Sequence, residues 1–232
     1  HIEGASHNRR FTHISGFRYK TNQYLLNSLQ TKGDYKPKYF DFQSFFTYDI
    51  ASKVELNFLG NIALNQYTVI PETRETAFGT YQNPLNLVIY YEGQEKDRFD
   101  NYLGALTLSY QPDANLNLKL IGSFFNSNEI IRYDILGQYW INLLDNTTGS
   151  ETANDSILNI GVGTNLQHAR NNLSAYVYNI SHKGSFYKQQ YSLKWGITWQ
   201  RERIFDRIRE WEMIDSAGYS VPNSDEIIEM YH

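Results

Sequence analysis

Residues 102–125, YLGALTLSYQPDANLNLKLIGSFF, constrain the fold more than any other part of the chain. Two alternating segments flank Pro-Asp-Ala-Asn, and because strand side chains alternate with period two, the stretch predicts a β-hairpin folded about residues 111–115. In the expected register Leu108 faces Leu118, Leu106 faces Leu120 and Gly104 faces Gly122, which makes one face entirely apolar or glycine. A slip of one residue would exchange the faces, so the pattern specifies the register strongly.

Residues 40–63 repeat this arrangement earlier in the chain. Folded about residues 49–53, Tyr48 faces Val54 and Phe46 faces Leu56 on an apolar face, while polar residues such as Glu55 occupy the other face. Two hairpins of one pattern are difficult to explain by chance. They predict an all-β antiparallel protein.

Composition narrows the functional class. A net charge of −4 gives no basic stripe for nucleic acid, and the absence of cysteine excludes disulfides and thiolate metal sites. No run of about 18 apolar residues predicts a transmembrane helix. Aromatic residues make up 16% of the chain although its mean hydropathy is −0.55. This combination is typical either of a soluble β-sandwich or of an outer-membrane β-barrel with a polar lumen and aromatic girdles.

The order of turns and connections favours the barrel. We expect about seven strands, with hairpin turns at about 49–53, 111–115 and 182–189 and long loops at 20–37, 68–98, 133–156 and 213–232. Outer-membrane barrels have short turns at one end of the barrel and long loops at the other, so their chains alternate between the two. For the same reason we assign residues 167–172, QHARNN, to a strand rather than to a turn. Tyr102 and Tyr110 lie about 26 Å apart along a strand. In a tilted strand this length nearly spans the apolar layer of a membrane.

The alternation also assigns residues to two environments. We expect one group of polar side chains to line a wet lumen: Glu55, Asn57, Asn61, Lys119, Lys194, Thr198 and Gln200. We expect one group of apolar side chains to face lipid: Leu56, Phe58, Leu106, Leu108, Leu118, Leu120, Leu193 and Trp195. In a soluble sheet the first group would simply face solvent and the second would form the core.

Catalytic and metal patterns are weak. The six histidines show no HExxH spacing, DSAGYS lacks the G-x-S-x-G elbow, and Gly161-Val-Gly163 lacks the third glycine of a nucleotide fingerprint. Glu210 and Glu212 share one strand face, but a solvated strand end explains them better. We therefore expect no enzyme activity, no metal and no cofactor.

Four segments have a familiar sequence: FTHISGFRYKTNQYLLNSLQTKGDYKPKYFDFQSF, QEKDRF…LGALTLSYQP, QHARNNLSAYVYNISHKG and LKWGITWQRERIFDRIREWEMIDSAGYSVP. They resemble the barrel region of TonB-dependent outer-membrane receptors, of the type with an N-terminal carboxypeptidase-regulatory-like domain. The resemblance implies a 22-stranded, up-and-down transmembrane barrel in the bacterial outer membrane. Seven strands cannot close such a barrel, and we see no signal peptide, TonB box or plug, so we expect residues 1–232 to be an internal barrel segment.

The resemblance also implies function and partners. Such a receptor takes up a scarce nutrient (a siderophore, cobalamin, an oligosaccharide or a peptide) with energy from TonB, which acts through the plug region. Outer-membrane lipid is then a partner, and relatives that pair with a surface lipoprotein suggest that partner too. Two alternatives remain open: a soluble β-sandwich that binds glycans through exposed aromatic residues, and an outer-membrane enzyme barrel.

Overall fold

The protein is one antiparallel β-sheet. The computed structural model describes residues 1–21, 33–147, 155–216, 219–221 and 227–231, with side chains described as far as Asp215. In these ranges the chain contains twelve strands and no helix. The all-β antiparallel class predicted from the hairpin patterns is therefore confirmed. The sheet is not closed, because its first and last strands are not paired with one another.

Seven long strands form the body of the sheet and correspond to the seven that the sequence predicts. They are β2 (Phe11–Thr21), β4 (Lys38–Ala51), β5 (Val54–Pro71), β7 (Asn83–Tyr110), β8 (Leu116–Leu144), β9 (Ser156–Lys188) and β10 (Tyr191–Ser216). Five short strands, which the sequence analysis missed, pair along them: β1 (Ile2–Ala5), β3 (Gly33–Tyr35), β6 (Arg74–Thr80), β11 (Tyr219–Val221) and β12 (Ile227–Tyr231). Each is five residues or fewer except β6, and is too short to show a clear alternation.

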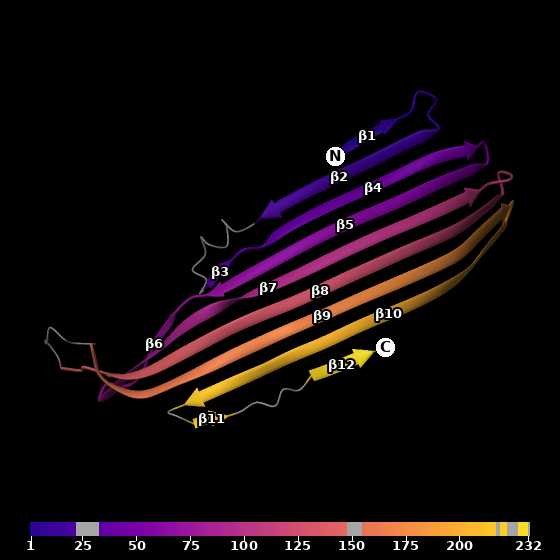
Figure 1. The fold of residues 1–232 in the computed structure, drawn as a ribbon. Helices are drawn as coiled ribbons and strands as arrows, with labels where there is room; N and C mark the ends of the chain where they lie inside the picture. The colour runs from indigo at the N-terminus through magenta and orange to yellow at the C-terminus, as the bar shows by residue number, and fades with distance from the viewer. Residues whose placement is uncertain (22–32, 148–154, 217–218, 222–226, 232) are drawn as a thin grey trace.

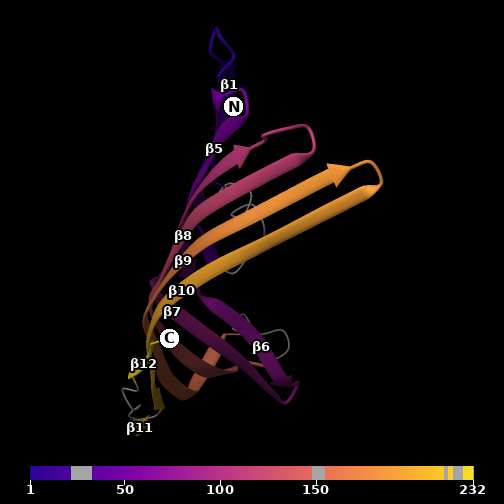
Figure 2. The same ribbon diagram turned by 90° about the vertical axis from the view of Figure 1, so that its right-hand side faces the viewer.

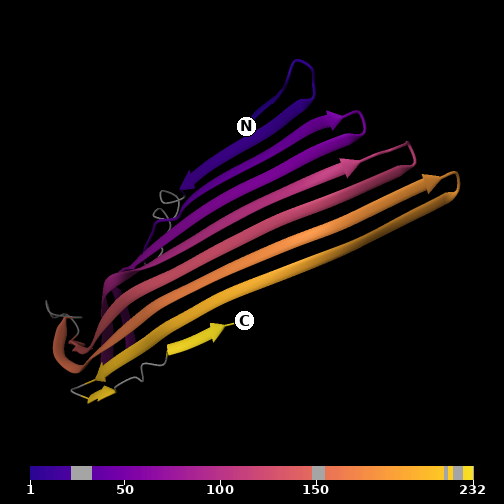
Figure 3. The ribbon, with the colours of Figure 1, turned by 45° about the vertical axis from the view of Figure 1, so that its right-hand side comes forward.

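The strands follow one another across the sheet in chain order. The main path runs β1-β2-β4-β5-β7-β8-β9-β10-β11, with β3 on β5, β6 on β7 and β12 on β10 (Figure 1). The sheet is strongly bent, as Figure 2 shows nearly edge-on, and its hairpin turns at one end are staggered from strand to strand (Figure 3). β1 and β12 lie at opposite sides of the sheet, so the N- and C-terminal strands are far apart.

Both predicted hairpins are present, but each register differs from the expected one by two residues. Leu108 pairs with Leu120 rather than Leu118, and Tyr48 pairs with Leu56 rather than Val54. The turn at 111–115 and the start of β8 at Leu116 are as predicted, but Tyr110 pairs with Leu118 rather than Leu116; in the first hairpin, β4 continues to Ala51 with an irregularity between Asp49 and Ala51. A shift of two keeps every side chain on its predicted face, because the side-chain period is two.

Several predicted turns and loops are strands in the structure. Residues 182–189 are mostly strand, and the turn there is only Gln189–Gln190. The predicted loop 68–98 instead holds the end of β5, β6 and much of β7, and the first half of the predicted loop 133–156 belongs to β8, which ends at Leu144. Residues 167–172 are strand within β9, as predicted. Parts of the predicted loops 20–37, 133–156 and 213–232 lie outside the described residues.

One sheet without a second layer leaves almost no core. Among the described side chains Ala169 is the buried apolar residue, and no large side chain is fully buried. Many large apolar side chains are exposed instead, for example Leu106 at 48%, Leu120 at 51% and Leu193 at 59%. A soluble chain of this length normally buries well over half of the surface that it exposes when unfolded. The sheet therefore requires an apolar environment or partner on this surface.

Candidate functional site

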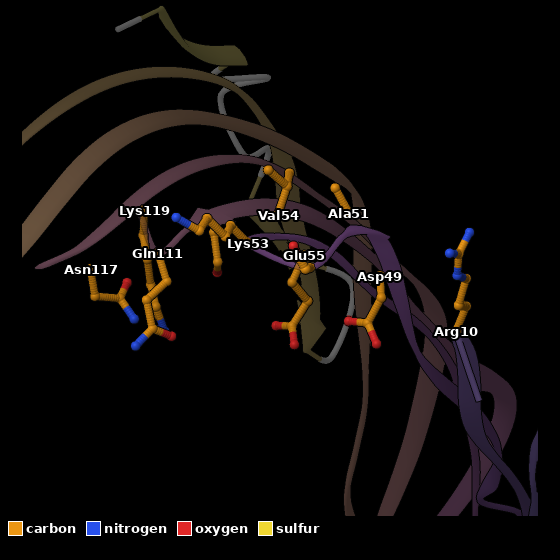
Figure 4. Close-up of a pocket in the computed structure, with 11 residues that line it drawn as sticks. Arg10, Asp49, Ala51, Lys53, Val54, Glu55, Gln111, Asn117 and Lys119 are labelled. Atoms are coloured by element: carbon orange, nitrogen blue, oxygen red, sulfur yellow. The ribbon is translucent and has the colours of Figure 1, made fainter. Parts of the chain in front are cut away.

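The two faces of the bent sheet have different chemistry. Figure 4 shows Glu55 and Asn117 pointing to the concave side of the sheet and Val54 pointing to the convex side. The register then assigns faces to the other strands, because directly opposed residues share a face. All eight residues predicted to contact lipid lie on the convex face: Leu56, Phe58, Leu106, Leu108, Leu118, Leu120, Leu193 and Trp195. All seven predicted lumen residues lie on the concave face: Glu55, Asn57, Asn61, Lys119, Lys194, Thr198 and Gln200.

On the convex face, the apolar residues form a band that crosses seven strands. We call this the apolar band. On each strand it starts near the short turns and ends at one residue: Tyr19, Phe40, Leu64, Tyr102, Phe124, Tyr176 and Trp199 on β2, β4, β5, β7, β8, β9 and β10. The next convex residue on each strand is polar: Thr21, Lys38, Gln66, Asp100, Asn126, Ser174 and Arg201. Six of the seven end residues are aromatic, which is the pattern of an aromatic girdle at a membrane interface.

The apolar band runs obliquely to the strands. The row of cross-strand partners that starts at Trp199 on β10 passes through Leu106 on β7 and reaches His13 on β2. On β2, however, the band ends at Tyr19, which lies six residues, or about 20 Å, beyond His13. Six strand spacings of about 4.8 Å give a lateral distance of about 29 Å, so the band makes an angle of about 35° with the rows. Strands of a membrane barrel are tilted by about 35–45°, and a level membrane would give this obliquity.

The concave face is polar and internally hydrogen bonded. Thr47 donates to Asn57 (2.7 Å), and Asn57 in turn donates to Glu55 (2.6 Å). Further across the sheet, on β9 and β10, the hydroxyls of Ser181 and Thr198 lie 2.8 Å apart. Asn61 donates to Asp41, and Gln200 donates to Glu202. These bonds hold the predicted lumen residues in fixed positions on β5, β9 and β10.

Near the short turns the concave face contains two adjoining hollows. The first, of about 490 Å³, is lined by Arg10, Asp49, Glu55, Ser109, Gln111, Asn117 and Lys119 among others (Figure 4). The second, of about 500 Å³, shares Asn117 and Lys119 and adds Lys183, Ser185 and Lys194. Together they form what we call the turn-end site, which joins lysines, carboxylates and amides in one polar concavity.

The lysines dominate the electrostatics of the turn-end site. Lys119 and Lys183 are direct cross-strand partners, and Lys194 lies two residue pairs nearer the turn, on the same face. Like charges directly opposite one another destabilise a sheet unless an anion lies between them. Lys194 also lies 5.8 Å above the ring of Tyr187, which supports its ammonium group. The arrangement can bind carboxylates, phosphates or sugar hydroxyls.

Sequence reasoning brought Glu55, Lys119 and Lys194 to this site but missed Lys183. The reason is that we expected a turn at 182–189, so these residues were not assigned to either face of the sheet. The alternation of Ser181, Lys183 and Ser185 with His182 and Gly184 is the signal that would have extended β9. Asn61 and Gln200 lie further along the concave face, away from the two hollows.

Metal and helix searches give negative results for the described residues. They hold no group of three or more metal-ligating side chains, and no helix there is long and apolar enough to cross a membrane. Comparison with models of known protein families finds no match, and no curated protein matches the chain. The apolar convex face and the polar concave face of the sheet are therefore the features that indicate a function.

Proposed function

We propose that this chain forms part of the wall of an outer-membrane β-barrel, in a receptor of the TonB-dependent type that takes up a scarce nutrient. The observation that carries the proposal is the oblique apolar band on the convex face, bounded by aromatic residues. In this barrel the convex face of the sheet contacts lipid, and the concave face lines a water-filled lumen. The proposal assigns no catalytic reaction to the chain.

The shape of the sheet supports this proposal. Consecutive antiparallel strands, short turns at one end and a polar concave face are the ingredients of an up-and-down barrel wall. The open edges of the sheet need further strands, because unpaired backbone groups are costly in a membrane. In the TonB-dependent type those strands would complete a barrel of 22.

The turn-end site supports a role for the lumen in binding. Its lysines and amides suit a polar or anionic surface, either the nutrient or a plug domain inside the barrel. Siderophore, cobalamin, oligosaccharide and peptide remain candidate nutrients. In receptors of this type energy comes from TonB through the plug, and a surface lipoprotein accompanies some of them; both partners are part of the proposal.

The competing β-sandwich would need a second sheet against the convex face. The strands of the described residues form one sheet only, which favours lipid as the cover over a second layer. Some of the exposed aromatic residues that suggested glycan binding, among them Tyr19, Tyr102 and Trp199, lie at the limits of the apolar band, where an aromatic girdle accounts for them.

Membrane partitioning tests the proposal. The protein is expressed in a Gram-negative host, and its membranes are extracted first with carbonate at high pH and then with detergent. We expect it to stay in the outer-membrane fraction through the first step and to be released by the second. A protein that is monodisperse in plain buffer would refute the barrel proposal and would favour the glycan-binding β-sandwich instead.

A further inference from the structure

Beyond the apolar band, the charges of β10 separate by face. Arg201, Arg203, Arg207 and Arg209 point to the convex side, whereas Glu202, Asp206, Glu210 and Glu212 occupy the intervening concave positions. Two hydrogen bonds confirm where the acids point, because Gln200 binds Glu202 and Asn171 binds Glu210 on the concave face. Arg201, Arg203 and Arg209 thus point away from these acids of their own strand.

The neighbouring strands add cations at the same level. Lys96 on β7 is the direct partner of Arg132 on β8, and Arg132 is the direct partner of Arg170 on β9. Arg209 continues this row, since the β9–β10 register on either side places it opposite Arg170. Four cations therefore lie side by side on four adjacent strands. Directly opposed like charges are unfavourable, so such a row indicates an anion outside the sheet.

We call Lys96, Arg132, Arg170, Arg209, Arg201 and Arg203 the convex cation field. Arg170 has an acidic partner, Asp134, at 2.5 Å. No carboxylate among the described side chains lies within ion-pair distance of the other five. All five are exposed.

Two further convex arginines are excluded from the field because each has a partner within the protein. Arg98 forms a 2.7 Å ion pair with Asp100 on the same strand, and Arg207 has an interaction partner of its own. Arg170 completes the row of cations but is neutralised by Asp134, so the charge available to a partner is that of the other five members of the field.

The field spans more height than a phospholipid headgroup. Arg201 follows the last residue of the apolar band directly and lies about 5 Å above it, whereas Arg132 and Arg209 lie roughly 20–25 Å above it at a strand tilt of about 35°. The headgroup region of a phospholipid layer is only about 5–8 Å deep on each side. A ligand that reaches the whole field must carry anionic groups on an extended polar head.

We propose that the convex cation field binds a phosphorylated glycolipid of the surrounding membrane leaflet, with phosphates both at the lipid anchor and along its saccharide. The inference rests on the proposed membrane insertion. Arginine suits phosphate because its guanidinium group forms bidentate charge-assisted hydrogen bonds. Between the band and the upper row, the polar side chain of Asn172 suits the saccharide hydroxyls, whereas Asn126, Asn128 and Ser174 form hydrogen bonds within the sheet.

The test uses the whole protein as the cell makes it, reconstituted in phosphatidylcholine nanodiscs. Rough lipopolysaccharide serves as the phosphorylated glycolipid, and binding is measured by titration with a fluorescent derivative. In Arg132→Gln/Arg209→Gln we expect binding to weaken by roughly 25-fold, about fivefold for each lost cation. The matched control, Lys20→Gln/Lys188→Gln, removes two exposed lysines away from the field and should change binding by less than about twofold.

Two further arms separate the sources of phosphate. Lipopolysaccharide treated with phosphatase should bind the wild type as weakly as the untreated lipid binds the arginine variant, and phosphatidylglycerol should show little difference between wild type and variant. Equal losses in the control pair, unchanged binding after phosphatase, or an equal effect on phosphatidylglycerol would each overturn the inference. Failure to remain in the membrane refutes the proposed function instead, so the two failures are distinguishable. Unchanged circular dichroism shows that each variant is folded.

Discussion

Leu106→Arg tests the central assumption that the convex face meets lipid. Leu106 is the middle residue of the apolar band on β7, four residues from Tyr110 at one end and four from Tyr102 at the other. Its side chain is 48% exposed, and its direct partners are Phe58 and Gly122. An arginine there would lie near the bilayer midplane, where the cost in a membrane barrel is about 2–4 kcal/mol.

The structure provides controls in the same strand. Thr107→Arg places the same charge one residue away on the concave face, where water solvates it, so we expect a loss below about 1 kcal/mol. Tyr110→Arg lies at the edge of the band, where the expected cost is about 0–1 kcal/mol. A ranking with Leu106 far above both controls is the signature of a lipid-facing surface.

The assay is reversible unfolding in guanidinium with lipid vesicles present, followed by tryptophan fluorescence. Free energies of unfolding are compared at equal lipid concentration, because folding depends on the vesicles. Equal losses for Leu106→Arg and Thr107→Arg would refute the assignment of faces. A wild type that folds equally well without lipid would refute the membrane assignment itself.

Three further predictions concern backbone, packing and charge. Gly93 has φ of 102°, and a Cβ there would lie 1.8 Å from a carbonyl oxygen of the paired strand, so Gly93→Ala should lower the free energy of unfolding by at least about 2 kcal/mol in the same assay. A Cβ at Gly184 would lie 2.1 Å from the ring of Trp195, so Gly184→Ala should displace that ring and shift its fluorescence, whereas Gly122→Ala, with nothing within 4 Å, should do neither. Burial, with two nearby glutamates, raises the pKa of Asp97, which lies beyond the apolar band, to about 6. Because the folded state then favours the protonated carboxyl, this group should make the protein more stable as the pH falls through 6 towards 4, and Asp97→Asn should remove that part of the pH dependence of the thermal midpoint.

The sequence predicts the faces of the sheet better than its connections. Period-two alternation placed Leu106, Lys119 and Trp195 on their observed faces even though the hairpin registers were off by two, because a shift of two leaves the faces unchanged. The pairing next to the turn was harder to predict, since the turn chemistry around Asp113 places the turn at 111–115 and the start of β8 at Leu116 but does not fix which residue of β8 pairs with Tyr110. Asp113 accepts hydrogen bonds from the backbone amides of Asn115 and Leu116, a local contact that the alternation does not reveal.

Long strands beyond the apolar band explain most of the errors in the predicted loops. β7, β8 and β9 contain 28, 29 and 33 residues, several times what a bilayer needs. Beyond the band their convex side chains are a mixture of polar, charged and apolar residues, for example Arg132, Asp134 and Leu136 on β8, so the alternation fades and the segments resemble loops. Backbone pairing continues regardless, because a ladder depends on main-chain hydrogen bonds rather than on side-chain polarity.

β10 shows how a single strand can encode both environments along its length. From Leu193 to Trp199 its convex residues are apolar and its concave residues small or polar; from Arg201 to Arg209 the convex residues are mainly cationic and the concave ones are acidic or aliphatic. A soluble sheet has no physical reason to change convex chemistry at one level on every strand. A membrane boundary supplies that reason, because hydrocarbon excludes charge below the level and anionic headgroups attract cations above it. The coincidence of the last apolar residue with the first cation on β10 therefore ties the proposed membrane position and the proposed glycolipid contact to the same boundary.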